Sequence, residues 1–192
     1  MTDQFDLRSD VKVFEFWIYL MTDLIIFAAL FASYIVLYKS IFGGPSAQEI
    51  FEMPKALQET LILLLSSFTC AMGMLAIHKT RKKTALCWFA ITVILGISFL
   101  TIEILEFTNL IKEGHGPNHS AFLSSFFALV GTHGLHISIG LIWMGVEMLR
   151  IFFRSLSEQN ISRIFRMVIF WHFLDFVWIF IFTIVYGMGH LS

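Results

Sequence analysis

The stretch GTHGLHISIGLIWMGVEM, residues 131 to 148, places two histidines three residues apart inside an otherwise apolar run. A second stretch, FWHFLDFVWIFIF at residues 170 to 182, contains a histidine and an aspartate in the same spacing. Apolar runs of roughly 20 residues are typical of helices that cross a membrane. Titratable groups inside such runs are costly in lipid and usually face protein or water. The two stretches therefore predict membrane helices that turn polar side chains toward one another.

The composition of the whole chain agrees with a bilayer environment. Of its 192 residues, 57% are hydrophobic and 14% are charged, and the mean hydropathy is +0.79. A net charge of −1 argues against the basic surface that nucleic-acid binding requires. The two cysteines, Cys70 and Cys87, lie in apolar segments without metal-ligand spacing and are interpreted as core thiols. Residues 1–12 mix acids and bases without a small-residue cleavage site, so no cleavable signal is expected.

We expect an all-α membrane protein in which residues 1–192 form a single domain of five transmembrane helices. The expected spans are about 13–38, 54–77, 85–111, 122–152 and 164–189. These runs are too long for barrel strands, and they do not alternate between polar and apolar residues. No proline interrupts them, so the broken helices of many transporters have no counterpart in the sequence.

The distribution of lysine and arginine predicts the orientation in the membrane. Ten of the 13 basic residues lie before the first span, between spans two and three, or around the joint of spans four and five; three lie on the other side. Because basic loops stay in the cytoplasm, the N-terminus is expected there and the C-terminus outside. We interpret the cluster of Arg81, Lys82 and Lys83 mainly as a determinant of this orientation. A contact with anionic lipid is a secondary interpretation.

The fourth span has two stripes. His133, Gly140 and Glu147 recur every seven residues, with His136 beside them, which makes one polar face. A neighbouring face carries mostly small residues, which would allow close helix packing: Gly134, Ser138, Leu141 and Gly145.

Counting helical rise from the cytoplasmic end of each span divides the buried polar residues into two layers. An inner layer at roughly 15 Å contains Asp23 and Asp175, with His172 about a turn shallower. An outer layer at roughly 20–27 Å contains Glu59, Glu103, His133 and His136, with Glu106 above it. Carboxylate–imidazole pairs cost less in lipid than separate ions do. We therefore expect Glu103 to approach one of the two histidines on span four.

Several functions remain open on this evidence. The histidines inside the expected spans are His133, His136 and His172. They do not form matched ligand pairs, because there are three of them and they differ in expected depth. This favours hydrogen bonding between helices over haem or metal ligation. Asp23 and Asp175 fit either a proton path or protonated packing residues. No nucleophile elbow, phosphate loop or zinc-protease motif is present. The chain could be a non-catalytic subunit of an energy-converting complex, a small proton-coupled transporter, or a haem-bearing cytochrome.

Four stretches narrow this choice by resemblance: FWIYLMTDLIIFAALFASY (16–34), EILEF (103–107), FFALVGTHGLHISIGLIW (126–143) and FWHFLDFVWIFIFTIVY (170–186). They resemble subunit III of the haem–copper respiratory oxidases, and within that family they are most similar to the bacterial cytochrome o ubiquinol oxidases. The resemblance covers about residues 12 to 189. Six residues match the family's motif positions: Glu103, Glu106, His133, His136, His172 and Asp175.

The resemblance implies a multi-pass subunit of the bacterial inner membrane with no catalytic, cofactor or metal site of its own. Haems and copper are expected in partner subunit I, which reduces oxygen and pumps protons. Subunits I, II and IV and membrane lipids are the implied partners, and nucleic acid is not. The implied role is support of assembly, of stability during turnover and of proton uptake, partly through bound phospholipid.

The sequence departs from the family in two respects. The cytochrome c branch has seven helices where five are expected here; the first two are missing, as in the quinol branch. Asp23 stands where that branch has a glutamate, so a proton-relay role for Asp23 depends on a side chain one methylene shorter. A menaquinol or cytochrome c oxidase remains an alternative, because subunits I and II choose the electron donor.

Overall fold

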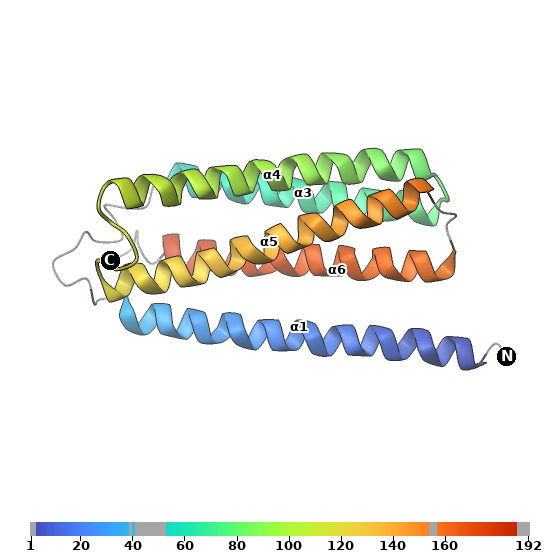
Figure 1. Ribbon diagram of the computed structural model, residues 1–192, viewed down its shortest axis with the longest axis horizontal. Helices are drawn as coiled ribbons and strands as arrows, with labels where there is room; N and C mark the ends of the chain where they lie inside the picture. Colours follow the sequence, from blue (N-terminus) through green and yellow to red (C-terminus); the bar gives the residue numbers. More distant parts are fainter. Residues whose placement is uncertain (1–2, 39, 41–52, 154–156, 188–192) are drawn as a thin grey trace.

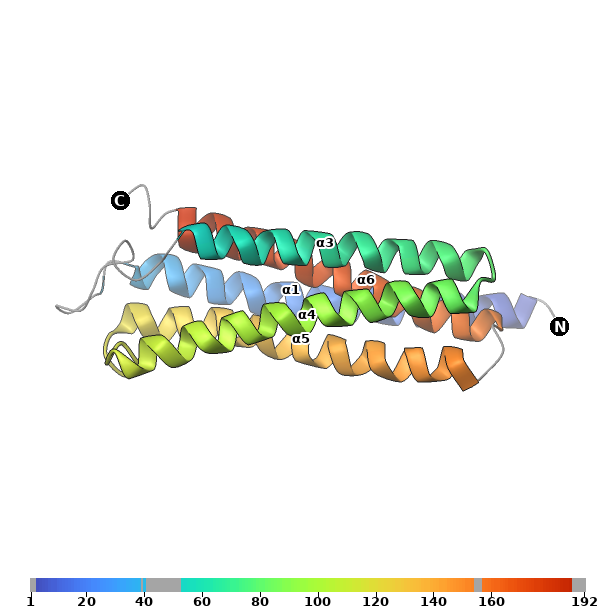
Figure 2. The ribbon, with the colours of Figure 1, turned by 90° about the horizontal axis from the view of Figure 1, so that it is seen from above.

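Five long helices run side by side along one axis in the computed structural model, which describes residues 3–38, 40, 53–153 and 157–187 (Figures 1 and 2). They are α1 (Asp3–Leu37), α3 (Met53–His78), α4 (Lys82–Lys112), α5 (Ala121–Phe153) and α6 (Glu158–Ile181). A π-helical segment, η1 (Phe182–Tyr186), continues α6. All five are long and apolar enough to cross a membrane, which confirms the predicted all-α fold with five spans.

The helix bounds differ from the expected spans mainly at two amino-terminal ends. Helix α1 begins at Asp3, ten residues before the expected start at 13, and α6 begins at Glu158 rather than at 164. The expected bounds followed hydropathy, whereas a helix can continue past the apolar region because its backbone hydrogen bonds do not depend on lipid. The apolar part of α1 itself begins at Phe14.

The connections separate the two ends of the bundle. The amino terminus, the α3–α4 turn and the start of α6 lie at one end, on the right of Figure 1, which we call the basic end. The α4–α5 connection and the end of η1 lie at the other, which we call the carboxy-terminal end. The three segments that carry most of the basic residues are therefore together, as the predicted orientation requires.

The α3–α4 turn is a Schellman motif without glycine. The amide of Arg81 donates to the carbonyl of Ala76, and the amide of Thr80 donates to that of Ile77. Thr80 adopts the left-handed conformation with φ of 55°. A β-branched residue in this conformation is strained, so the packing of α3 against α4 has to hold the turn in place.

Helix α6 occupies the centre of the bundle and contacts α3, α5 and α1 (Figure 2). Its Trp171 is almost fully buried and lies where α4 and α5 come close. A Cβ atom added at Gly96 would lie 2.8 Å from Trp171 Cη2, and one added at Gly140 would lie 3.3 Å from its Cε3. The indole ring therefore requires glycine on both neighbouring helices.

The two glycines of the small-residue stripe predicted on span four do not make the close helix contacts. A Cβ atom at Gly145 would meet nothing within 4 Å, and one at Gly134 would make only an ordinary contact of 3.9 Å with Leu100. Gly140, which was assigned to the polar face, is the close contact instead. The position of the large Trp171 ring on α6 determines which glycine of α5 makes the close contact between helices.

Candidate functional site

The titratable residues singled out from the sequence lie inside the bundle. Asp23, Glu59, Glu103, His133 and Asp175 are buried. The other three are half-buried: Glu106, His136 and His172. Their partners differ in part from those expected. Seven of the eight form three separate groups, and His133 belongs to none of them.

The first group joins α1 to α5. The Asp23 Oδ2 atom lies 3.7 Å from the His136 Nε2 atom. The His136 Nδ1 atom lies 2.7 Å from the carbonyl oxygen of Thr132 and donates to it, because a carbonyl can only accept. The ring of Phe27 covers the imidazole at a centroid distance of 5.2 Å. The second imidazole nitrogen faces the carboxyl group, at a distance longer than that of a hydrogen bond.

This pairing corrects the predicted division into layers. Asp23 was assigned to the inner layer with His172 and Asp175, yet it lies beside His136 of the outer layer. The depth count began at residue 13, whereas the helix begins at Asp3. The relative heights of two helices are set by their packing, so span ends taken from hydropathy misplaced Asp23 relative to α5.

The second group joins α6 to α3. The His172 Nδ1 atom lies 3.3 Å from the hydroxyl oxygen of Ser67, and the Asp175 carboxyl group hydrogen-bonds to the same serine. His172 and Asp175 do share a helix face, as their spacing predicted. Their partner is a hydroxyl group on α3 rather than the expected carboxyl group on α1.

Two tryptophans extend this α3–α6 contact. The Trp171 indole donates to Ser66 Oγ at 3.1 Å, and the Trp178 indole donates to Thr60 Oγ1 at 3.1 Å. Sequence reasoning missed these hydroxyl groups. A signal was available on α6, because Trp171 and Trp178 are seven residues apart and therefore lie on one face of the helix.

The third group lies near the carboxy-terminal end and contains three glutamates. Glu103 interacts electrostatically with Glu59 on α3 and with Glu106 one turn along α4. Tyr186, at the end of η1, interacts with all three. Among the described residues, the carboxyl oxygens of Glu59 and Glu103 have no hydrogen-bond partner. We call Glu59, Glu103, Glu106 and Tyr186 the glutamate cluster.

His133 does not belong to this cluster. Its ring is enclosed by Trp178, Phe99 and Phe27 at centroid distances of 5.3, 6.1 and 6.3 Å, and neither ring nitrogen has a hydrogen-bond partner. The expected pairing of Glu103 with a histidine is therefore wrong. Phe99, one turn before Glu103 on α4, occupies the position beside His133, so the carboxyl group lies a turn further along among the other acids.

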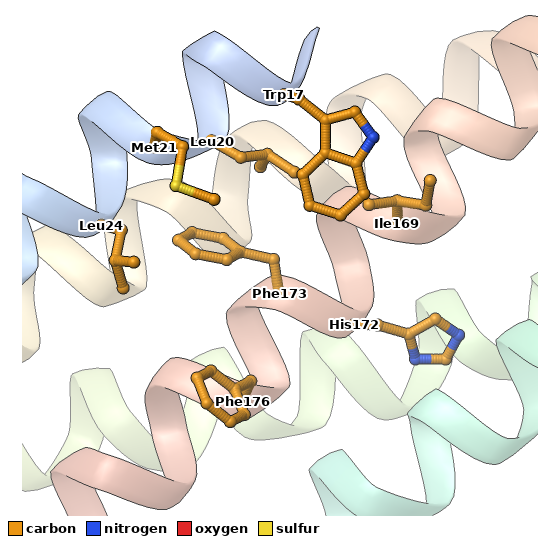
Figure 3. Close-up of a pocket in the computed structure, with 8 residues that line it drawn as sticks. All are labelled: Trp17, Leu20, Met21, Leu24, Ile169, His172, Phe173 and Phe176. Atoms are coloured by element: carbon orange, nitrogen blue, oxygen red, sulfur yellow. The ribbon is translucent and has the colours of Figure 1, made fainter. Parts of the chain in front are cut away.

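A shallow apolar groove of about 330 Å³ lies between α1 and α6 (Figure 3). Its lining consists of Trp17, Leu20, Met21 and Leu24 from α1 and Ile169, His172, Phe173 and Phe176 from α6. His172 is the only titratable side chain among these eight, and its imidazole lies on the side of α3, as its contact with Ser67 requires. The groove offers an apolar surface and no set of metal ligands.

At the basic end, Arg150 donates to the buried Glu147 carboxylate at 2.6 Å. Arg81 and Lys83 are exposed in the α3–α4 turn and the start of α4, and Lys82 is half-buried. No group of three or more His, Cys, Asp or Glu side chains among the described residues is placed to hold a metal ion.

The fold and these groups define a helical, multi-pass membrane protein whose buried acids and histidines connect its helices. Comparison with known proteins identifies the family. The family model described as cytochrome c oxidase subunit III matches residues 8–190, and the chain belongs to this family.

Three curated relatives show how similar its members are. Cytochrome bo(3) ubiquinol oxidase subunit 3 of Pseudomonas aeruginosa is 55% identical over 93% of this chain and 86% of its own length. The protein of the same name from Pseudomonas putida is 50% identical over 95% and 88%. Cytochrome c oxidase subunit 3 of Bacillus sp. PS3 is 43% identical over 95% and 88%. The chain is thus a multi-pass inner-membrane subunit III of a terminal oxidase.

Proposed function

We propose that the chain is the non-catalytic subunit III of a haem–copper oxidase that passes electrons from ubiquinol to oxygen. The observation that carries this proposal is the identity of 55% and 50% with two ubiquinol oxidase subunits over more than nine-tenths of the chain. The relative named for cytochrome c is less similar, at 43%. Ubiquinol is therefore the donor that the complex uses.

In this proposal the redox chemistry takes place in other chains. Haems and copper reside in subunit I, and subunits I, II and IV are the partners of this chain in the membrane. The polar groups between α1 and α5 and between α3 and α6 hold the helices in register for assembly. Asp23, paired with an imidazole that can share its proton, serves proton uptake from the basic end.

Lipid takes part at two places. The apolar groove between α1 and α6 receives an acyl chain of a phospholipid. The cations of the α3–α4 turn and the start of α4, of which Arg81 and Lys83 are exposed and Lys82 is half-buried, attract anionic headgroups. The basic end then faces the cytoplasm, in agreement with the distribution of lysine and arginine.

The test is purification of the tagged chain from its own membranes in a mild detergent. We expect haem absorbance in the reduced-minus-oxidised spectrum and oxygen uptake driven by ubiquinol. Reduced cytochrome c and menaquinol serve as alternative donors, and the chain expressed without the other subunits serves as the control.

The outcomes separate the candidate functions. Haem in the complex and none in the isolated chain supports a non-catalytic subunit. Oxygen uptake with cytochrome c or menaquinol in place of ubiquinol would overturn the donor. Haem retained by the isolated chain, or purification without any oxidase subunit, would overturn the proposal as a whole.

A further inference from the structure

The glutamate cluster is unusual because it brings together three acids in the interior of a membrane bundle. Glu59 is fully buried and Glu103 is 3% exposed, and they come from different helices. The cation that interacts with Glu59 is Lys55, one turn earlier on α3 and exposed. A single exposed ammonium group cannot balance three carboxylates, and like charges this close oppose joint ionisation.

A second observation comes from another helix. Tyr34 of α1 is fully buried, its hydroxyl group has no hydrogen-bond partner, and it interacts electrostatically with Tyr186 of the cluster. Its ring is held by Tyr38 and by Phe122 of α5, at centroid distances of 6.0 and 5.8 Å. Within the part of the chain that the structure describes, five buried oxygen atoms of these residues have no hydrogen-bond partner: both of Glu59, both of Glu103, and the Tyr34 hydroxyl.

The donor chemistry indicates what binds. Buried oxygens of carboxyl and hydroxyl groups need hydrogen-bond donors, which are protons on the acids themselves and ordered water. No group of acids and histidines among the described residues is placed to hold a metal ion. Tyr186, which interacts with the acids, is the last residue of the π-helical segment η1, and π-helical turns often occur at functional sites.

The position of the cluster gives it access to water. Glu59 lies six residues after the start of α3 and Glu103 nine residues before the end of α4, which is within roughly 14 Å of the carboxy-terminal end. Glu106 is half-buried and lies one turn closer to that end.

We infer that the glutamate cluster, with Tyr34, is a proton- and water-binding site that holds at least two protons at neutral pH and exchanges them with water at the carboxy-terminal end. Nothing is oxidised or reduced in this exchange: a proton moves between a carboxyl oxygen and water. The titratable groups that interact electrostatically at the site are Glu59 and Lys55 from α3, Glu103 and Glu106 from α4, Tyr186 from η1, Tyr34 from α1, and Tyr38 just after α1. This inference goes beyond the proposed function and does not depend on the electron donor.

Infrared spectroscopy of the tagged chain, extracted with its bound subunits, tests the inference. Protonated carboxylic acids have a carbonyl stretch distinct from that of carboxylates. We expect the band of protonated carboxylic acids at neutral pH. Glu103→Gln and Glu59→Gln should each lower its intensity by the contribution of one acid. Transfer into D2O should shift the same band in the wild type.

The matched control is Glu147→Gln, which removes a buried glutamate that is paired with Arg150 at the basic end. It should leave the band unchanged. Two different glutamates are tested, so the failure of one variant to assemble leaves the other decisive. Spectra that do not differ between wild type and the two cluster variants, a band lost equally in Glu147→Gln, or a band that D2O does not shift would overturn the inference.

Discussion

Individual residues in this bundle act through the partner that each one meets across a helix interface. The imidazole of His136 donates to its own helix and turns its other nitrogen to Asp23 on α1. His133, three residues away, has only aromatic rings around it. Two histidines of one motif thus have different chemistry, because the helix turn between them directs them to different neighbours.

Asp23→Asn tests the proton role at the residue scale. Asparagine keeps the size of the side chain beside His136 but cannot release a proton, so we expect normal haem content with a lower proton-to-electron ratio and faster loss of activity during turnover. Both are measured in proteoliposomes that contain the complex. Glu158→Gln, an exposed acid in the first turn of α6, is the control. If the proton-to-electron ratio and the lifetime during turnover were unchanged in Asp23→Asn, Asp23 would have a packing role only.

Ser66→Ala tests the hydroxyl contacts between α3 and α6. The change leaves the buried Trp171 indole without its acceptor and should destabilise the chain by about 0.6–1 kcal/mol. The matched control is Ser98→Ala, because the Ser98 hydroxyl donates to the Ile94 carbonyl within its own helix. Thermal unfolding of the complex followed by tryptophan fluorescence compares the two. An equal effect of both changes would contradict a role for the interhelical bond.

At the scale of whole elements, the distance between helices depends on which glycine meets a large ring. Trp171 needs the absence of a side chain at Gly96 and at Gly140, while Gly145 is open. Helix α4 also begins from a turn in which a threonine holds a left-handed conformation. Neither feature could be predicted from the periodicity of the sequence, because periodicity describes one helix at a time.

Gly96→Ala should lower the melting temperature. The added methyl group would lie 2.8 Å from both Trp171 and Leu141, and overpacking of this kind costs about 1–3 kcal/mol. The gain in helix propensity, about 1 kcal/mol, offsets part of the loss. Gly145→Ala has this gain without the clash and should be neutral or stabilising. Equal melting temperatures for the two variants would argue against the close contact.

Thr80→Gly should stabilise the α3–α4 turn. Glycine adopts a φ of 55° without the strain of a β-branched side chain, and the expected gain is about 1 kcal/mol. Thr84→Gly, within the regular backbone of α4, is the matched control and should destabilise instead. Chemical denaturation in mixed micelles measures both. Destabilisation by Thr80→Gly would show that the hydroxyl bond from Thr80 to the Lys79 carbonyl outweighs the strain.

At the scale of the whole molecule, the two ends differ in charge. The amino terminus, the α3–α4 turn and the start of α6 share the basic end, and the glutamate cluster lies toward the opposite end. The interior between the two ends contains carboxyl, imidazole and hydroxyl groups. The lysines and arginines of the described helices lie near the helix ends instead.

This asymmetry predicts the topology. Alkaline phosphatase, which is active only outside the cytoplasm, should be active when fused to the C-terminus and inactive when inserted after Thr80. The physical reason is retention of basic segments in the cytoplasm. Enzyme activity in whole cells is the measurement, with the amount of fusion protein determined by immunoblot. The reverse pattern would overturn the orientation.

The sequence by itself determined the number of helices, their class and their approximate bounds. Length and hydropathy are sufficient for this, because lipid leaves a chain of this kind only helices to form. The clustering of Lys and Arg also indicated the basic end. The motifs EILEF and GTHGLH pointed to the family that the comparison then showed.

Only the tertiary structure decided which polar groups meet. Periodicity assigns a residue to a helix face, but the axial shift and the crossing of two helices depend on packing, here of Trp171 against Gly96 and Gly140. The arrangement of the helices as a whole places Asp23 beside His136 and leaves Glu103 among other acids. A shift of one helical turn, about 5.4 Å, changes every partner while the hydropathy profile stays the same.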